Sequence, residues 1–190
     1  LVPREHVDPF DHIGQGHFLR GADNDHSGNR DFLVGDVFEA RSGCRRLEDP
    51  SIMAIEGEPV LLMHGDTLCT GDVEYQRFRC MVRDPAWQAQ FLQLPLAQRR
   101  QIADDLRKQS QQETKGKTAE IMDVTQSTVD RYMQQYDVHL LIHGHTHRPD
   151  VHQWQHNDRI MQRIVLGDWH EQGSVLRWDQ DGYRLSRLPR

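Results

Sequence analysis

The sequence predicts an α/β fold in which short apolar strands end in loops rich in histidine. Two apolar runs, residues 59–63 and 138–142, each lead directly into a His-Gly pair. Between and beyond these runs lie stretches with the residue spacing of amphipathic helices and of further strands. Strands and helices that alternate along one chain are typical of α/β domains. With 190 residues, 36% of them hydrophobic, the chain has the size of a single domain.

The first 26 residues differ in composition from the rest of the chain. They contain few aliphatic residues and many Asp, His and Gly residues, and they show no steady hydrophobic period. Such a segment buries too little apolar surface to hold a fixed structure. We therefore predict a poorly ordered leader over residues 1–26 and one folded domain over residues 27–190.

The predicted elements of the folded domain follow one another as a hairpin, a helical segment, and a second group of strands. The hairpin pairs residues 51–55 with residues 59–63 around a turn at Glu56-Gly57. Helices are expected over residues 72–83, 86–93 and 97–109, with Pro85 and Pro95 as breaks, and again over residues 127–136. The remaining predicted strands are residues 138–142, 160–166, 174–178 and 183–187, and Pro149 is expected to end regular structure after the first of them.

The helical segment, residues 72–117, combines basic residues with an apolar face. It is either a solvated helical hairpin packed on the core or a lid. A lid would hold an acyl chain on its apolar side and an anionic head group or a membrane surface on its basic side. Ser110, Thr114 and Lys117 fall in a polar stretch that we expect to form a loop able to donate hydrogen bonds to a ligand.

Charge and cysteine content exclude several classes of protein. The net charge of −6 argues against general nucleic-acid binding, and no apolar run approaches the ~20 residues that span a bilayer. The first residues lack the basic-then-apolar order of a signal peptide. The three cysteines, Cys44, Cys69 and Cys80, form no C-x-x-C motif. A cytoplasmic protein is expected.

Candidate metal ligands follow the predicted strands. His64 comes directly after residues 59–63, and His145 and His147 come after residues 138–142. Asn29 and Arg30 lie in the turn-forming run 28–31. Because ligands gather where strands of an α/β sheet end, these side chains are expected to meet around a divalent transition metal. Taken singly, each has a plainer interpretation as a turn residue or a hydrogen-bonded histidine.

The same motifs carry a resemblance to a known family. They are Gly28-Asn29-Arg30-Asp31-Phe32-Leu33, Leu62-Met63-His64-Gly65-Asp66-Thr67-Leu68-Cys69, Ile121-Met122-Asp123-Val124, Leu141-Ile142-His143-Gly144-His145-Thr146-His147-Arg148-Pro149 and Val165-Leu166-Gly167-Asp168-Trp169-His170. From about Gly28 onward, the chain resembles the UDP-2,3-diacylglucosamine pyrophosphohydrolases, which belong to the calcineurin-like metallophosphoesterases. The combination is more specific than the Gly-Asn and Gly-His-x-His motifs of the wider superfamily.

The resemblance implies a fold, a reaction and a location. The fold is a four-layer α/β sandwich with a helical insertion lid over residues 72–117. The reaction is the hydrolysis of UDP-2,3-diacylglucosamine to UMP and 2,3-diacylglucosamine 1-phosphate in lipid A biosynthesis, at a site with two Mn²⁺ ions. Two metals suit this reaction because they neutralise the phosphoryl oxygens and provide hydroxide. A monomer bound peripherally to the cytoplasmic face of the inner membrane is expected.

The resemblance also implies roles for individual residues. Asn29, His64 and His145 would hold one metal, and His147 would belong to the other. Catalysis would depend on His145 and on Arg30, whose guanidinium matches phosphate geometry. Substrate would contact Asn29, Arg30, Asp72, Ser110, Thr114, Lys117 and His145. His143 would support the site from behind or serve the fold alone.

The sequence departs from the family at its start. The family's Asp-x-His and Gly-Asp motifs do not appear before Gly28, so four of seven expected ligands are present. Asp36 follows a glycine but aligns with a segment that carries no ligand. No apolar strand orients the other donors of this region, which are Asp11, His12, Asp23, Asp25 and His26.

The chain is therefore expected to correspond to the family's enzyme without its N-terminal third. Two alternatives remain open at this point. One is a general metallophosphoesterase that acts on smaller phosphoesters. The other is a non-catalytic remnant that binds a metal or a lipid nucleotide without turning it over.

Overall fold

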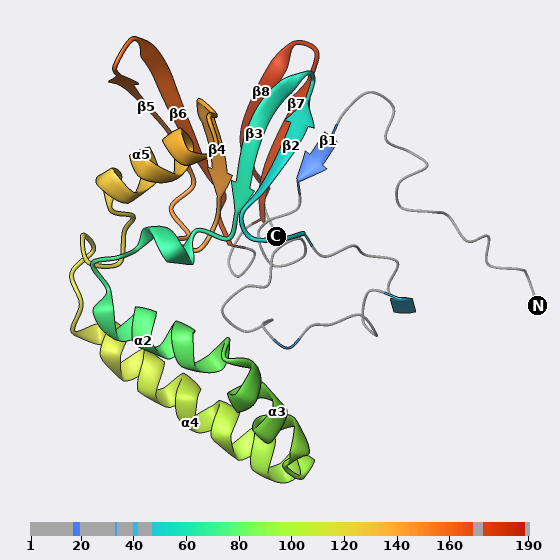
Figure 1. Cartoon of the computed structure of the whole chain (residues 1–190), viewed down its shortest axis with the longest axis vertical. Helices are drawn as coiled ribbons and strands as arrows, with labels where there is room; N and C mark the ends of the chain where they lie inside the picture. Colours follow the sequence, from blue (N-terminus) through green and yellow to red (C-terminus); the bar gives the residue numbers. More distant parts are fainter. Residues whose placement is uncertain (1–16, 20–32, 34–39, 42–46, 169–172, 189–190) are drawn as a thin grey trace, which may run out of the picture.

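The computed structural model describes residues 17–19, 33, 40–41, 47–168 and 173–188 (Figure 1). Its strands are β1 (His17–Leu19), β2 (Ser51–Ile55), β3 (Glu58–Met63), β4 (Leu140–His143), β5 (Asp150–His156), β6 (Arg159–Val165), β7 (Gly173–Asp179) and β8 (Gly182–Leu188). Its helices are the short 3-10 helix η1 (Asp66–Leu68), α2 (Val73–Val82), α3 (Pro85–Gln93), α4 (Leu96–Lys115) and α5 (Gln126–Gln135).

The described strands form two sheets. The larger sheet has the order β2-β3-β4-β6-β5; β3, β4 and β6 run parallel, and the two outer strands are antiparallel to their neighbours. The smaller sheet has the antiparallel order β1-β7-β8. In the larger sheet Met63 is paired with His143, and His143 with Val165, so the three parallel strands end at the same edge. The loops that follow these strands are thereby brought together.

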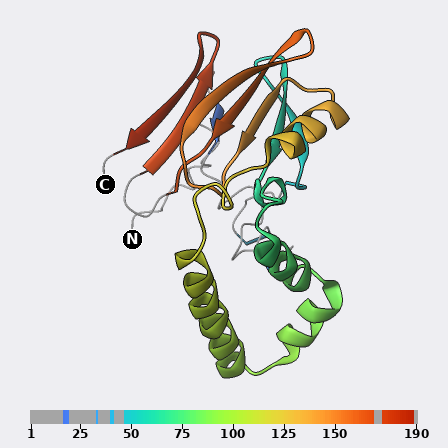
Figure 2. The ribbon, with the colours of Figure 1, turned by 90° about the vertical axis from the view of Figure 1, so that its left-hand side faces the viewer.

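Two apolar clusters hold the layers together. One fills the space between the sheets and contains Val60, Ile142 and Ile164 from the larger sheet with Leu176 and Trp178 from β7. The other lies between the larger sheet and α5, and includes Leu61, Leu141, Val129 and Met133. Figures 1 and 2 show α5 against the face of the larger sheet that is turned away from β7 and β8. The described residues thus form three layers, and the fourth layer implied by the resemblance stays a prediction.

Two elements differ from the sequence-based prediction. Pro149 does not end regular structure, because β5 begins at the next residue and pairs with β6 as an edge strand. An edge strand needs one apolar face at most, and β5 has few apolar residues, chiefly Val151 and Trp154, so its pattern was too polar to predict a strand. Proline directly before an edge strand removes no hydrogen bond from the sheet.

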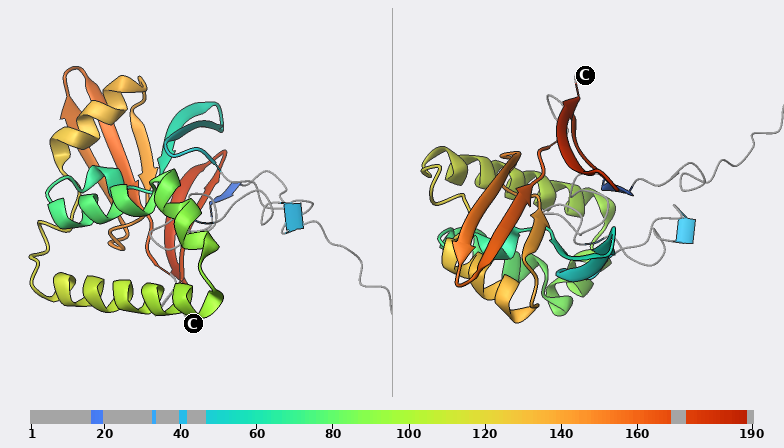
Figure 3. Two further views of the ribbon diagram at one scale, coloured as in Figure 1. Left: turned by 60° about the horizontal axis from the view of Figure 1, so that its bottom comes forward. Right: turned by 90° about the horizontal axis from the view of Figure 1, so that it is seen from above.

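Helix α4 is longer than predicted and includes Ser110 and Thr114, which were expected in a loop. Figure 3 shows it as one uninterrupted helix. Residues 109–115 lack hydrophobic spacing but contain no glycine or proline, so nothing in them breaks a helix. The Thr114 hydroxyl donates to the Ser110 carbonyl oxygen, 2.8 Å away, one turn earlier. Helix α4 ends at Lys115, followed by Gly116.

Helices α2, α3 and α4 occupy the segment predicted as a lid. Figure 2 shows α2 and α3 on one side and α4 on the other, joined far from the sheets. No residue of α3 or α4 is buried, and the Trp87 and Phe91 rings stack with their centroids 5.0 Å apart. The structure thus places helices here, whereas their role as a lid stays a prediction. None of the helices in the described ranges has the length and apolar character needed to cross a membrane.

Candidate functional site

His64 and His145 lie together at the ends of two adjacent parallel strands. His64 follows β3, and His145 comes two residues after β4. The Gly144 amide donates to the His64 carbonyl oxygen at 3.0 Å, which ties the two loops together through the backbone. The two imidazole centroids are 5.0 Å apart with the rings edge to face, and only 3% of His64 is exposed. The structure therefore brings these two histidines together, and their role as metal ligands stays a prediction.

The loop after β4 has an unusual backbone conformation. His145 has φ 64° and His147 has φ 55°, so both residues adopt the left-handed conformation. This conformation is unfavourable for residues with a β-carbon, and it persists only where the surrounding structure enforces it. The preceding strand end and the Gly144 hydrogen bond provide that constraint. The strain is therefore found at the residue that contacts His64.

The imidazole of His145 is neutral and has an unpaired nitrogen. Burial lowers the pKa of His145 to about 4; charge on neighbouring His64 also lowers it, while Asp66 opposes the shift. In the described part of the chain, His145 Nδ1 is buried without a hydrogen-bond partner. A neutral imidazole with a free lone pair is the form of histidine that binds a transition metal. The donor chemistry of the pair therefore fits such an ion.

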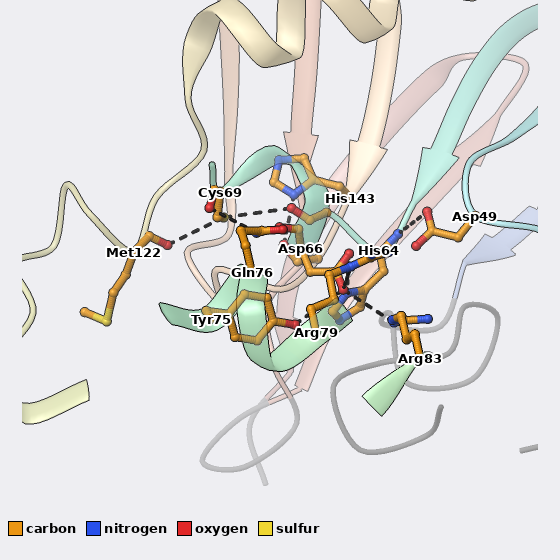
Figure 4. A network of polar contacts seen from close by, with 12 residues as sticks. Asp49, His64, Asp66, Cys69, Tyr75, Gln76, Arg79, Arg83, Met122 and His143 are labelled. Atoms are coloured by element: carbon orange, nitrogen blue, oxygen red, sulfur yellow. Dashed lines mark hydrogen bonds and ion pairs between the residues drawn. The ribbon is translucent and has the colours of Figure 1, made fainter. Parts of the chain in front are cut away.

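Asp66 lies behind His64 and was not predicted as part of the site (Figure 4). Its side chain is fully buried. It accepts hydrogen bonds from Arg79 Nε at 2.7 Å, from Tyr75 OH at 3.3 Å and from Arg83 Nη2 at 3.4 Å. Its Oδ1 lies 3.4 Å from His64 Nδ1. Burial alone would raise the pKa of Asp66, but the His64 contact and the two arginine charges lower it well below its usual range. Asp66 is therefore a carboxylate that can orient His64.

His147 lies beside a carboxylate that follows β6. Its imidazole is exposed, and its Nδ1 is 3.3 Å from the carboxylate of Asp168, which was not predicted as a ligand. Among the residues that the structure describes, no three His, Cys, Asp or Glu side chains are grouped closely enough to hold a metal ion. Asn29 and Arg30 lie outside the described residues, so their predicted places in the site are not tested.

The other donors discussed from the sequence near the start of the chain also lie outside the described residues. They are Asp11, His12, Asp23, Asp25, His26 and Asp36. The expected disorder of residues 1–26 is likewise untested. Of that segment, only β1 is described, where it pairs with β7.

Asp72 and Lys117, 45 positions apart in sequence, form a half-buried ion pair. Lys117 Nζ lies 2.6 and 2.9 Å from the two carboxylate oxygens of Asp72. Asp72 also accepts a hydrogen bond from the Tyr75 amide, which caps the start of α2. The pair thus connects the beginning of α2 with the end of α4. Ser110 and Thr114 are exposed on α4 and are not part of this pair.

The two described cysteines differ sharply in environment, and this difference predicts their reactivity. Burial raises the pKa of Cys69 to about 12, with the negative charges of Asp123, Asp66 and Asp72 adding to the shift, whereas Cys80 is exposed. Because the thiolate is the reactive form, iodoacetamide at mildly alkaline pH should modify Cys80 and spare Cys69. Peptide mass spectrometry of the native protein measures both. Equal labelling would contradict the burial of Cys69, and urea should abolish the difference.

Known proteins that are similar in sequence to this chain carry the same name. No protein-family model matches it. It is 51% identical over 162 residues to the UDP-2,3-diacylglucosamine hydrolase of Azotobacter vinelandii, covering 85% of this chain and 67% of that protein. It is 49% identical over 170 residues to the hydrolase of the same name from Stenotrophomonas maltophilia, covering 86% and 68%. The corresponding protein of Chromohalobacter salexigens is 54% identical over 155 residues, covering 81% and 63%.

These matches extend well beyond the histidine motifs. They include most of the described chain, and this chain spans about two thirds of the length of the relatives. Identity near one half over such a length does not arise from a shared motif alone. The chain belongs to the UDP-2,3-diacylglucosamine hydrolase family.

Proposed function

We propose that this protein hydrolyses the pyrophosphate bond of UDP-2,3-diacylglucosamine and releases UMP and 2,3-diacylglucosamine 1-phosphate, a step of lipid A biosynthesis. The observation that carries the proposal is the identity of about one half, over 85% of the chain, to hydrolases named for this substrate. The convergence of His64 and His145 supports it, because two adjacent imidazoles could hold a metal ion, and a metal ion would supply the positive charge that pyrophosphate hydrolysis needs.

The proposed cofactor is Mn²⁺, with two ions as in the family pattern. Asn29, His64 and His145 would hold one ion, and His147 would belong to the second, with Asp168 beside it. The support is the neutral His145 imidazole and its unpaired nitrogen. When bound, such ions neutralise phosphate charge and make hydroxide available at neutral pH.

The chain's own residues would bind and orient the substrate. The His145 ring contacts two others, with centroid distances of 5.0 Å to His64 and 4.9 Å to Tyr75, and therefore has little freedom to turn. Arg30 would donate to the phosphate with its planar guanidinium. Asp72 and Lys117, together with Ser110 and Thr114 on α4, would contact the nucleotide-sugar portion.

The helices α2 to α4 would receive the acyl chains. The support is their partly exposed apolar side chains, which include the stacked Trp87 and Phe91 rings. Because the acyl chains of the substrate favour a membrane over water, we place the protein at the cytoplasmic side of the inner membrane, peripherally bound. We propose that it is a monomer. Its basic residues on α2 and α4 suit an anionic membrane surface.

Product analysis by ³¹P NMR tests the proposed reaction. The full chain is incubated with UDP-2,3-diacylglucosamine and Mn²⁺, and a matched sample contains a chelator. UMP and the sugar 1-phosphate should form only with metal. Equal turnover of UDP-glucosamine without acyl chains would instead indicate a general metallophosphoesterase. Bound metal and bound substrate without product would indicate a non-catalytic protein.

The ion pair between Asp72 and Lys117 gives a more specific prediction. Lys117→Ala should raise KM roughly tenfold, the effect of losing about 1.4 kcal/mol of binding, and should leave the Mn²⁺ content unchanged. Steady-state kinetics and elemental analysis measure the two quantities. Lys115→Ala is the matched control, because Lys115 is exposed at the last position of α4, two residues before Lys117, and should have no effect. A change in Mn²⁺ content alone would refute the substrate role of Lys117.

A further inference from the structure

A buried histidine–arginine pair lies directly beneath the loops that carry His64 and His145. His143 is 1% exposed and ends β4, while Arg163 is 5% exposed and lies on β6. Arg163 Nη1 is 3.1 Å from His143 Nε2, and His143 Nδ1 is 2.9 Å from the Gly144 carbonyl oxygen. The two strands are neighbours, so the pair connects adjacent strands at the edge where the site forms.

These contacts fix the tautomer of His143. A guanidinium has donors only and does not lose its proton, so His143 Nε2 must be the acceptor. The hydrogen of the neutral ring is therefore on Nδ1, from which it is donated to the Gly144 carbonyl. The opposite tautomer would place a hydrogen against Arg163 and leave the Gly144 carbonyl without this bond. The arginine thereby determines which backbone group the histidine binds.

The same imidazole also supports the loop that carries His64. Gly65 has φ 104°, and a β-carbon placed on it would lie 2.7 Å from His143 Nδ1. The ring is therefore packed against the backbone between His64 and Asp66. His143 thus contacts both loops at once, through packing at Gly65 and through a hydrogen bond at Gly144. The bond from the Gly144 amide to the His64 carbonyl completes the connection.

We infer that His143, held in its Nδ1–H tautomer by Arg163, is a positioning residue that sets the separation of His64 and His145. The inference deepens the proposed function, since it concerns the same pair of imidazoles. In the described part of the chain, the buried Nε of Arg163 has no hydrogen-bond partner. A buried cation beside a neutral ring adds less stability than apolar residues would, which favours a positional role.

The tautomer and its effect on the loop are measurable without metal or substrate. Long-range ¹H–¹⁵N NMR of the full chain should show His143 protonated on Nδ1. Arg163→Met should allow the Nε2–H form of His143. Exchange of the Gly144 amide hydrogen should then be at least about tenfold faster, because the ring no longer holds the loops that place this amide against the His64 carbonyl oxygen. Arg159→Met is the matched control on the same strand, where the exposed Arg159 pairs with Asp137. An Nε2–H ring in the unchanged protein, or unaltered Gly144 exchange in Arg163→Met, would overturn the inference.

Two replacements of His143 distinguish a role in positioning the ligands from a role in stabilising the fold alone. His143→Asn retains a donor near Nδ1, whereas His143→Leu removes it. Mn²⁺ affinity, measured by EPR of the free ion, should fall roughly tenfold in His143→Leu and recover in His143→Asn. Equal affinities in the two variants would count against the inference. If the unchanged protein binds no Mn²⁺, the proposed function fails, and the NMR result still decides the positioning role. Arg163→Gln, whose amide can present either a donor or an acceptor to His143 Nε2, replaces Arg163→Met if that variant does not fold.

Discussion

Replacing Asp66 with asparagine should lower the free energy of unfolding by roughly 3 kcal/mol, the lower end of the range for breaking a buried ion pair. The carboxylate is fully buried and accepts from Arg79, Arg83 and Tyr75 while it contacts His64. An amide keeps the shape but removes the charge, so two guanidinium groups lose their counter-ion. The cost is at the lower end because both arginines are partly exposed. Urea denaturation followed by circular dichroism measures the change.

A matched aspartate tests whether burial is the cause. Asp105 lies on α4 with its side chain exposed, where it accepts from Gln101 and contacts Lys108. Asp105→Asn should change the free energy of unfolding by less than about 0.5 kcal/mol. If the two substitutions had the same small effect, Asp66 would not be the structural centre of the contacts in Figure 4.

Replacing His64 with alanine should weaken Mn²⁺ binding more than about a hundredfold, beyond the effect of losing a residue that only supports a ligand. The imidazole is one of two that the structure brings together, so its loss removes half of the described donor pair. Isothermal titration with Mn²⁺ measures the affinity, and the same variant should release no detectable UMP.

The control for this substitution is a histidine outside the site. His139 precedes β4, is partly exposed and lies 3.8 Å from Glu58. His139→Ala should leave Mn²⁺ affinity unchanged. Because His64 is buried, the unfolding midpoint of each variant is measured alongside. Unchanged affinity in a folded His64→Ala variant would exclude His64 as a ligand.

The sequence predicted the parts of the site that depend on local pattern. An apolar run that ends in His-Gly indicates a buried strand and the loop after it, and parallel pairing of β3 with β4 then brings His64 and His145 together. The hairpin of β2 and β3 was predicted from two apolar runs separated by Glu56-Gly57. In the structure both turn residues adopt the positive φ that a tight turn needs.

The parts that were missed depend on contacts between distant residues. Asp66 follows a histidine and a glycine, but its role arises from Arg79 and Arg83 on α2. The strand β5 is recognisable only through its partner β6, because edge pairing tolerates a polar sequence. The His143–Arg163 pair likewise joins two strands that are adjacent only after folding. Hydrophobic periodicity carries no signal for such pairs.

The most direct test of the account is the location of manganese in crystals of the full chain grown with Mn²⁺, measured by anomalous diffraction at the manganese absorption edge. The account predicts an anomalous peak at coordination distance from both His64 and His145. A peak elsewhere, with these two imidazoles bound to no metal, would contradict it.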